Sequence, residues 1–500
     1  PFFFSGKQIS GLKRGDAERL AEVKDCIPDT DMACFSFLYD VIRCDFHSGK
    51  DCSRLVFDRM VSFLDGVNGG LSEKDARFTG LQMLNWTFAL YYYMDSPLLT
   101  EELFERIMRS FYARVRCVYR GVWLPCLFSR NVSPVVEALF LYVVGLLFPF
   151  LPDSARWMRV GKRRFEREIA GLIEEDGTCP YFSMPGLRMV AQLLTWGIRL
   201  GELNHRPLAP VVYERARQCL RFWDVCVDPV SGWMPNMGLD DEVTFLNLTG
   251  EDARDFRPTL DDLRVVLSGK AFRMQESFFW YGLPVPEIVP RRTEGAYAFE
   301  NGGYYVVQEK SVKTFMTCRK SPASSAPADL LQLDIWADGV NVLMDMGTCD
   351  CEGNTLAPER RCKRRYIPCF LRLFRQKQGA AEITGTSDEW VLEGAVRTFC
   401  ELKQKIMHRR KVIKKMGENC WEVHDRVRNV PRKEKLVHWH LNPLAKDRVT
   451  IVCEDCNGWP LSPLVEERPY ISGFGMKDVL IRMTFSTFTS GFNTKIVIQE

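Results

Sequence analysis

Apolar side chains recur at helical spacing through the first half of the chain. After Thr100 they fall every three or four residues from Leu103 to Tyr112, which predicts one buried face of a helix. Thr100 is a suitable N-cap, and the acids Glu101 and Glu102 suit a first helical turn. The same spacing returns in residues 81–93, 134–148, 189–203 and 211–225. Several of these segments are apolar nearly all round, which predicts helices covered on both sides, as in the inner layer of an α/α toroid.

The period of the pattern changes after residues 283–295, LPVPEIVPRRTEG, whose three prolines disfavour a helix. In residues 330–348 apolar and polar side chains alternate around a central Asp338-Gly339, which predicts a hairpin. Alternating runs continue to the C-terminus. The sequence therefore predicts a multidomain α+β protein. We expect an incomplete N-terminal α/α toroid over residues 1–285, a proline-rich linker over 286–295, and an antiparallel β-sandwich over 296–500.

Composition narrows the class of protein without naming a function. The chain has 500 residues, 46% of them hydrophobic and 26% charged, and a net charge of +3, so bulk charge does not favour a nucleic-acid partner. The longest apolar run, 135–150, contains Glu137 and is short for a membrane span, so we expect a buried helix and no membrane span. The 18 cysteines are scattered among apolar neighbours, which weakly favours a reducing compartment.

Several strings, in order along both predicted domains, resemble the heparinase II/III-like family of polysaccharide lyases. They are LNWTFALYYYMDSPLLTEELF, ALFLYVVGLLFPF, EEDGTCPYFSM, QLLTWGIRL, VSGWMPNMGLDD, LQLDIWADGVNVLMDMGT and GFGMKDVLIRMTFSTF. The resemblance implies a toroid followed by a sandwich, and an ancestry in β-elimination on uronate-containing anionic polysaccharides. It also implies a periplasmic or cell-envelope location.

β-Elimination requires a group that neutralises the uronate carboxylate, a base for the neighbouring proton and an acid for the leaving oxygen. The resemblance implies three places for these groups, and the chain departs from the family at each. Residues 130–133 read Arg-Asn-Val-Ser where the family has an Asn-Asn-His-like string. Residues 185–188 keep only the Arg of an Asn-Tyr-His-Arg string, and Pro327 stands where the family has His or Gln. Only His47 and His205 lie in the helical half, so a His-based mechanism requires a sandwich His to reach the cleft.

Three residues remain as catalytic candidates: Asn131, Tyr181 and Arg188. Asn131 and Arg188 match motif positions and have the chemistry to neutralise a uronate carboxylate. The alternatives are that Asn131 caps the helix opened by Pro134 and that Arg188 pairs with Glu174 or Glu175. Tyr181 is a candidate phenol base, although an ordinary Tyr titrates near ~10 and a role in lining the loop is the alternative.

The substrate-binding candidates come from a loop and a basic patch: Arg130, Trp233, Asn236, Asp240, Arg361, Arg364 and Arg365. Trp233 has the shape to stack on a sugar ring, and its alternative is a buried loop anchor. The arginines of ERRCKRRY form a local positive patch that suits an acidic glycan. A second basic run, HRRKVIKK at 408–415, is expected to be a solvated face on alternate residues of a strand.

The cofactor prediction is a structural zinc in the sandwich, held by Asp345, Cys349 and Cys351 with Cys362 and Cys369 near in sequence. A Cys-x-Cys pair with further cysteines suits a tetrahedral thiolate site, but this spacing is not a standard one. Free thiols or a disulfide are the alternative, and no other cofactor is predicted.

Three functions follow from different classes of protein. The first is a lyase that acts on uronate-containing polysaccharide by β-elimination. The second is a catalytically impaired relative that only binds acidic polysaccharide. The third is a structural role in which apolar side chains such as Met184, Leu187 and Met189 fill the old groove. The resemblance favours the first two.

Overall fold

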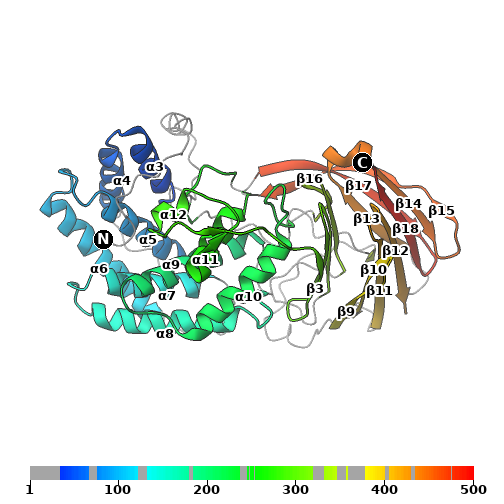
Figure 1. The fold of residues 1–500 in the computed structure, drawn as a ribbon, viewed down its shortest axis with the longest axis horizontal. Helices are drawn as coiled ribbons and strands as arrows, with labels where there is room; N and C mark the ends of the chain where they lie inside the picture. The colour runs from blue at the N-terminus through cyan, green and yellow to red at the C-terminus, as the bar shows by residue number, and fades with distance from the viewer. Residues whose placement is uncertain are drawn as a thin grey trace.

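The computed structural model describes residues 34–66, 76–121, 132–179, 184–236, 245–246, 248–252, 254–318, 331–345, 356–358, 378–399, 405–429, 434–473 and 476–499. Helices occupy the N-terminal part and two β-sheets the C-terminal part (Figure 1). The predicted fold class, a helical region followed by antiparallel sheets, is confirmed.

The helices match the apolar spacing of the sequence. Leu103 N donates to Thr100 Oγ1 at 3.2 Å, so Thr100 caps its helix as predicted. The apolar run after Pro134 forms a helix whose side chains are almost all buried, and it packs against its neighbours α5, α8 and α9. None of the helices in the described ranges is both long enough and apolar enough to cross a membrane. The helices are α3 (Leu38–Ser48), α4 (Ser53–Gly66), α5 (Ala76–Tyr92), α6 (Glu101–Gly121), α7 (Ser133–Leu147), α8 (Ser154–Leu172), α9 (Met184–Leu203), α10 (Pro210–Cys226), α11 (Arg257–Ser268) and α12 (Ser277–Trp280).

Two antiparallel sheets form the sandwich. One has the order β15-β14-β18-β12-β11-β10-β9, and the other runs β16-β17-β13-β7-β6-β5-β4-β3, with β8 beside β13. A buried core that includes Val307, Ile335, Val412 and Trp439 lies between them. Figure 1 shows the sheet with β3 and β16 between the helices and the other sheet.

The strands of these sheets are β3 (Gly295–Phe299), β4 (Tyr304–Glu309), β5 (Val312–Thr317), β6 (Leu333–Ala337), β7 (Val340–Leu343), β8 (Leu356–Pro358), β9 (Gln378–Gly385), β10 (Glu389–Phe399), β11 (Lys405–Lys415), β12 (Cys420–Arg428), β13 (Lys435–Leu441), β14 (Val449–Asp455), β15 (Pro460–Leu461), β16 (Leu464–Gly473), β17 (Met476–Thr487) and β18 (Gly491–Ile498). A 3₁₀ helix, η1 (Pro443–Arg448), connects β13 to β14, and a short parallel pair, β1 (Lys270–Ala271) with β2 (Glu287–Ile288), precedes the sandwich.

The hairpin predicted at 330–348 is present as β6 and β7. Its turn residues Asp338 and Gly339 both have positive φ, 52° and 85°. A turn of this kind matches the right-handed twist of the two strands and accounts for the Asp-Gly pair in the sequence.

The helices pack on the outer face of the nine-stranded sheet, the face turned away from the other sheet. Phe222 of α10 contacts Phe299 and Tyr304, with ring centroids 4.9 and 5.1 Å apart. The fully buried Lys313 of β5 donates to the carbonyls of Cys226 and Val227 at 2.7 and 2.8 Å. Helices and sheet therefore share a packed junction that contains a buried cation.

The basic run at 408–415 forms β11, and alternate residues such as Arg409 and Lys415 are exposed as predicted, but the basic residues of the other parity are not solvated. Arg410 and Lys414 point into the sandwich and are 0% and 1% exposed. Arg410 forms a fork with Asp425 at 2.8 Å on both bonds, and Lys414 pairs with Glu309 at 2.6 Å. Burial alone would raise the pKa of Asp425, but Arg410 and His408 hold it well below its ordinary value. Partners on other strands thus make burial of these charges possible.

Candidate functional site

The Asp-Gly loop before α9 is anchored on both domains. Asp176 accepts from the Thr178 hydroxyl at 2.6 Å and from the backbone N–H of Asn301, beside β4, at 2.8 Å. Gly177 has φ +85°, and a Cβ there would lie 2.1 Å from the Gln218 carbonyl oxygen of α10. Only glycine fits such a close backbone approach. The loop is therefore seated on α10 and on the sandwich before the chain enters α9.

Arg188, on the first turns of α9, is turned into the protein. Its side chain is 8% exposed, its guanidinium lies 4.3 Å from the ring centroid of Phe256, and Nη2 donates to the Asp255 carbonyl at 2.7 Å. Burial lowers the pKa of Arg188 to about 10, against the opposing effect of Asp255. Glu175, one of its two expected partners, pairs with Arg215 at 3.8 Å. A role for Arg188 toward a uronate stays a prediction.

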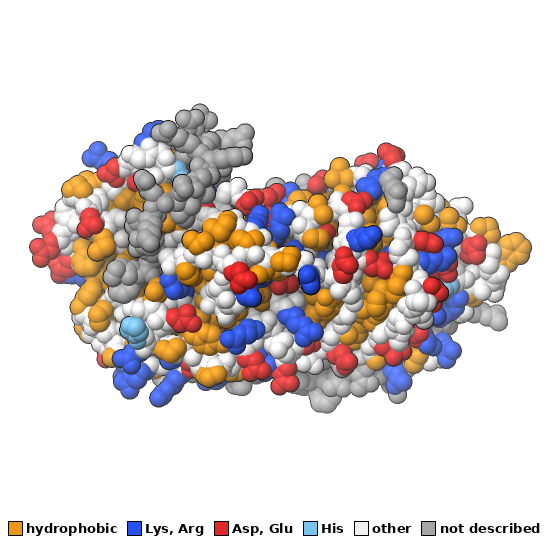
Figure 2. All heavy atoms as spheres, viewed as in Figure 1, with side chains coloured by type: hydrophobic (Ala, Val, Ile, Leu, Met, Phe, Trp, Pro, Cys, Tyr) orange, Lys and Arg blue, Asp and Glu red, His pale blue; other side chains and the backbone are white. Residues whose placement is uncertain are grey.

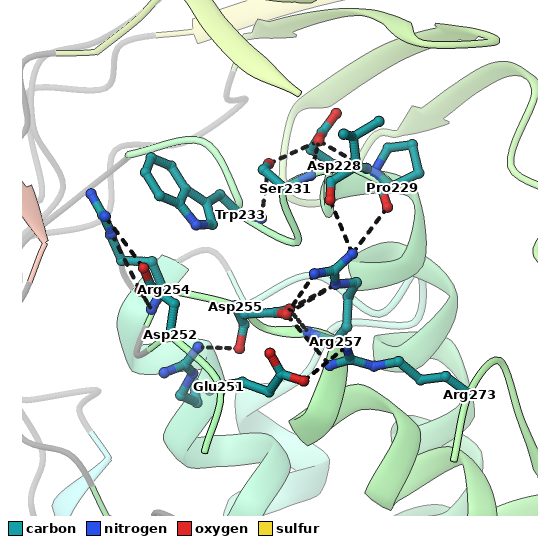
Figure 3. A network of polar contacts seen from close by, with 12 residues as sticks. Asp228, Pro229, Ser231, Trp233, Glu251, Asp252, Arg254, Asp255, Arg257 and Arg273 are labelled. Atoms are coloured by element: carbon teal, nitrogen blue, oxygen red, sulfur yellow. Dashed lines mark hydrogen bonds and ion pairs between the residues drawn. The ribbon is translucent and has the colours of Figure 1, made fainter. Parts of the chain in front are cut away.

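The loop after α10 carries Trp233 at the domain junction. The carboxylate of Asp228 shapes the loop by accepting from Val230 N, Ser231 N and Ser231 Oγ at 3.1, 2.7 and 2.8 Å. Trp233 is half-buried, and the Arg254 guanidinium lies 3.7 Å from its ring centroid, as Figure 3 shows. Asn236 is also half-buried, further along the same loop.

An ion network surrounds this stacked pair (Figure 3). Arg257 forks onto Asp255 with its shortest bond at 2.7 Å, and Arg273 reaches Asp255 and Glu251 at 3.4 Å each. These bonds to Asp255 raise the pKa of Arg257. The Arg254 guanidinium lies 3.4 Å from the Asp252 carboxylate, which also accepts from the backbone N–H of Arg254 at 2.7 Å. Arg254 combines this long contact with its position over the Trp233 ring.

The loop also meets the sandwich. A Cβ at Gly339, in the β6–β7 turn, would lie 2.8 Å from the side chain of Val230. Arg254 is close enough to Tyr470 of β16 to lower the pKa of that phenol, although burial raises it overall. Trp233 and Arg254 therefore lie where the helical region approaches the nine-stranded sheet. Figure 2 shows an indentation along the upper edge between the two regions, with acidic and basic side chains beside it.

Two histidines that the sequence analysis did not select lie on the same outer face of the nine-stranded sheet. His438 and His440 alternate along β13 with Val437, Trp439 and Leu441, which belong to the sandwich core. His438 Nδ1 is 2.9 Å from Thr484 Oγ1. His440 is 0% exposed, and burial, with the charges of His438 and Arg482, lowers its pKa to about 3. The signal was present in the sequence as His-Trp-His, because residues i and i+2 of a strand share a face.

Asp345, the described member of the predicted zinc set, follows β7 and is 2% exposed. Its neighbour Met344 donates its backbone N–H to the His440 carbonyl at 3.0 Å, so Asp345 enters the same region of the sheet. Within the described ranges, no three His, Cys, Asp or Glu side chains are grouped so that they could hold a metal ion. The zinc site therefore stays a prediction.

Most of the other predicted site residues lie outside the described residues. They are Arg130, Asn131, Tyr181, Asp240, Cys349, Cys351, Arg361, Arg364 and Arg365.

Residues 291–458 match the family model "Heparinase II/III-like, C-terminal". The chain carries a heparinase II/III-like domain. This match confirms the resemblance in the part of the chain that holds most of the two sheets. None of the curated proteins compared with the chain matches it.

Solved structures extend the likeness to both regions. A crystal structure of heparinase III has a TM-score of 0.70 and 14% identity, covering 99% of this chain and 80% of its own. The heparinase III-BT4657 gene product has a TM-score of 0.62 and 10% identity over 95% of this chain and 79% of its own. A mutant of heparan sulfate lyase HepC from Pedobacter heparinus gives 0.62 and 14% over 95% and 77%. At these identities the likeness establishes the fold alone, and the activity of this chain requires a separate argument.

Proposed function

We propose that the protein binds uronate-containing anionic polysaccharide where the loops 228–236 and 251–257 approach the nine-stranded sheet. The observation that carries the proposal is the Arg254 guanidinium stacked 3.7 Å from the Trp233 ring centroid at this junction. An indole offers an apolar face to a sugar ring, and a guanidinium offers a fork to its carboxylate.

The contacts of Arg254 suit this role. Its guanidinium atoms Nε and Nη2 lie 3.4 Å from the Asp252 carboxylate, which is long for a charge-assisted hydrogen bond. Burial raises the pKa of Asp252, but hydrogen bonds from Arg254 outweigh burial and lower it. A uronate carboxylate is a competing acceptor of the same kind, whereas Arg257 and Arg273 are already paired with Asp255 and Glu251. The heparinase III-like fold and the family match support the choice of polysaccharide as ligand.

β-Elimination is the second candidate, and one observation favours it. His438 and His440 lie on the sheet face that is turned toward the helices. The lowered pKa keeps His440 neutral at pH 7 but also makes it a weak base, so a role in proton transfer requires substrate binding to raise this pKa. Both rings are buried, at 4% and 0% exposure, so proton transfer requires the face to open when substrate binds.

The experiment is an absorbance assay for unsaturated uronate ends, run beside a binding titration. The panel contains heparan sulfate, chondroitin sulfate, hyaluronan and alginate. The variants are Arg254→Ala, Trp233→Ala and, as a matched control, Arg109→Ala, which removes an exposed arginine of α6 paired with Glu105 at 2.6 Å. We expect saturable, salt-sensitive binding that weakens about tenfold in Arg254→Ala and is unchanged in the control.

The outcomes separate the candidates. New absorbance that is lost in His440→Gln but kept in the control would establish a lyase. Binding without absorbance would establish a polysaccharide-binding relative. Binding that is equal in wild type and in both junction variants would refute the proposed location.

A further inference from the structure

The outer face of the seven-stranded sheet, on the side of the sandwich away from the helices, carries a basic cluster at one end. Its members are Arg397 of β10, Arg409 of β11, and Arg426 and Arg428 of β12. Residues of the other parity, such as Val396, Val412 and Val427, are buried toward the core, so these four arginines share the outer face. The strand register brings them together, because Arg409 lies opposite Arg426 and Met407 lies opposite both Arg397 and Arg428.

Arg409 and Arg426 lie opposite each other on adjacent strands, and the repulsion between their positive charges is unfavourable unless an anion is bound. Neighbouring strands are about 4.8 Å apart, and like charges directly opposite one another destabilise a sheet. Arg409 is paired with Glu393. Within the described part of the chain, Arg397, Arg426 and Arg428 form no ion pair with a carboxylate. The cluster therefore holds more positive charge than its described neighbours neutralise.

Arg426 is held in place without being neutralised. Its Nη1 donates to the carbonyls of Asp425 and Phe492 at 2.8 and 2.9 Å, and its Nη2 donates to Asn493 Oδ1 at 2.7 Å. The Asp425 carboxylate points inward and is paired with Arg410, so it does not neutralise Arg426. Three neutral acceptors thus fix a charged guanidinium at the surface.

Two exposed aromatic side chains lie at the same end of the sheet. Trp459, in the β14–β15 hairpin, is 70% exposed, and Phe488, between β17 and β18, is 72% exposed. The two turns touch, because Cys456 Sγ is 3.3 Å from Ser490 Oγ. Ser490 also accepts a backbone hydrogen bond from Val427, between Arg426 and Arg428. Figure 2 shows basic and hydrophobic side chains close together at the sandwich end of the molecule.

We propose that this end of the seven-stranded sheet is a second binding surface for an anionic polysaccharide. The guanidinium groups of Arg397, Arg426 and Arg428 bind its carboxylates or sulfates, and Trp459 and Phe488 contact the apolar faces of its sugar rings. The surface lies on the opposite side of the sandwich from the domain junction. It holds a long chain on the protein while another part of that chain occupies the junction, which raises the effective concentration at the junction.

Charge spacing favours a polysaccharide over a nucleic acid. Glu393, Glu422 and Glu454 are interspersed on the same outer face, and they would repel a closely spaced phosphate backbone more than a sparsely charged glycan. The choice of glycan among polyanions also rests on the proposed function.

The test is a titration of the full chain with a heparan sulfate oligosaccharide and, separately, with an alginate oligosaccharide, with stoichiometry and affinity as readouts. The main variant is Arg397→Ala/Arg428→Ala, because both side chains are exposed and form no described bonds that folding would lose. Trp459→Ala tests the aromatic contact. Lys415→Ala is the matched control, since it removes an exposed charge from the far end of β11, about 20 Å from Arg409.

We expect the wild type to bind at two sites and the double variant to lose one of them, with that affinity falling about a hundredfold at about tenfold per arginine. The part of the ligand-induced quenching of tryptophan fluorescence that comes from Trp459 should disappear in Trp459→Ala, and Lys415→Ala should match the wild type. Unchanged stoichiometry and affinity in the double variant would overturn the inference, as would tighter binding of an oligothymidylate than of either glycan.

The result also separates this surface from the junction. If Arg254→Ala abolishes binding and the double variant does not, the second surface is refuted and the junction proposal stands. If only the double variant loses binding, the second surface stands and the junction proposal fails.

Discussion

Arg410 and Arg254 show two ways in which this protein holds an arginine. Arg410 is 0% exposed between the sheets, with both bonds of its fork to Asp425 at 2.8 Å. The Arg254 side chain is 25% exposed, contacts Asp252 at 3.4 Å and covers Trp233. All the contacts of the Arg410 guanidinium stabilise the fold, whereas the Arg254 guanidinium has contacts that a ligand can replace.

The difference shows that local charge content does not identify a binding residue. The run at 408–415 has the higher density of basic residues, yet its inward half is structural. Burial and the geometry of the partner decide which charges a ligand can reach, since an ion pair away from water is costly to break.

The largest effect should come from Arg410→Ala. It leaves Asp425 buried without its guanidinium, so we expect the free energy of unfolding to fall by about 3–5 kcal/mol. Urea denaturation measures the loss. Arg410→Met/Asp425→Leu should recover most of it, because apolar side chains of similar volume need no partner. If Arg410→Ala lowers the free energy of unfolding by less than about 1 kcal/mol, Arg410 does not differ from Arg254 in its contribution to stability.

The next effect concerns the pH dependence of stability that comes from Asp262, a buried carboxyl in contact with neutral side chains. Burial raises the pKa of Asp262 to about 8, although Ser277 Oγ and Gln275 Nε2 donate to it at 2.5 and 2.9 Å. The folded state therefore holds a proton that the unfolded state releases, so its stability contribution is full below the unfolded pKa and declines as pH rises toward about 8. Asp262→Asn should gain about 3 kcal/mol relative to wild type between pH 5 and pH 7, at about 1.4 kcal/mol per pH unit. Parallel stability curves for the two proteins would contradict this expectation.

A smaller effect is expected from Lys313→Met at the domain junction. Burial lowers the pKa of Lys313 to about 7, and the amine donates to two carbonyls of the helical region. The contribution of a group with a lowered pKa is present above its unfolded pKa and is lost as pH falls through the folded one. The variant should therefore cost about 1–2 kcal/mol at pH 9 and less at pH 6. Thermal unfolding at both pH values measures this, and a larger cost at pH 6 would reverse the assigned sign.

The smallest effect on stability should come from Arg254→Ala. A half-exposed guanidinium with one long ion pair and one ring contact contributes below about 1 kcal/mol. Polysaccharide affinity should fall while the melting temperature barely changes. A large loss of stability would place Arg254 in the same class as Arg410.

The fold could be predicted because local patterns specify it. The alternation of Leu333 and Ile335 with polar neighbours, closed by Asp338-Gly339, needs no distant partner to indicate a hairpin. The cap at Thr100 is equally local.

The candidate site could be predicted less well, because its partners are distant in sequence. Arg188 is fixed by Asp255 and Phe256, 67 and 68 positions away, and Lys414 by Glu309, 105 positions away. No periodicity in one segment indicates such pairs. The sequence indicates that Trp233 lies on a loop, but its stacking on Arg254 depends on how two loops meet.

The close packing of Gly177 against α10 attaches the first part of the loop before α9. The residues expected to carry the chemistry lie further along the same segment. Gly177 and Asp176 attach the loop to α10 and to the sandwich. The positions where the resemblance places proton-transfer groups follow these two residues in the sequence. Residues downstream can therefore be exchanged while the loop keeps its attachment. This modularity allows a lineage to lose or replace a reaction and still inherit the scaffold around it, and it marks residues 181–188 as the place to graft a new reaction.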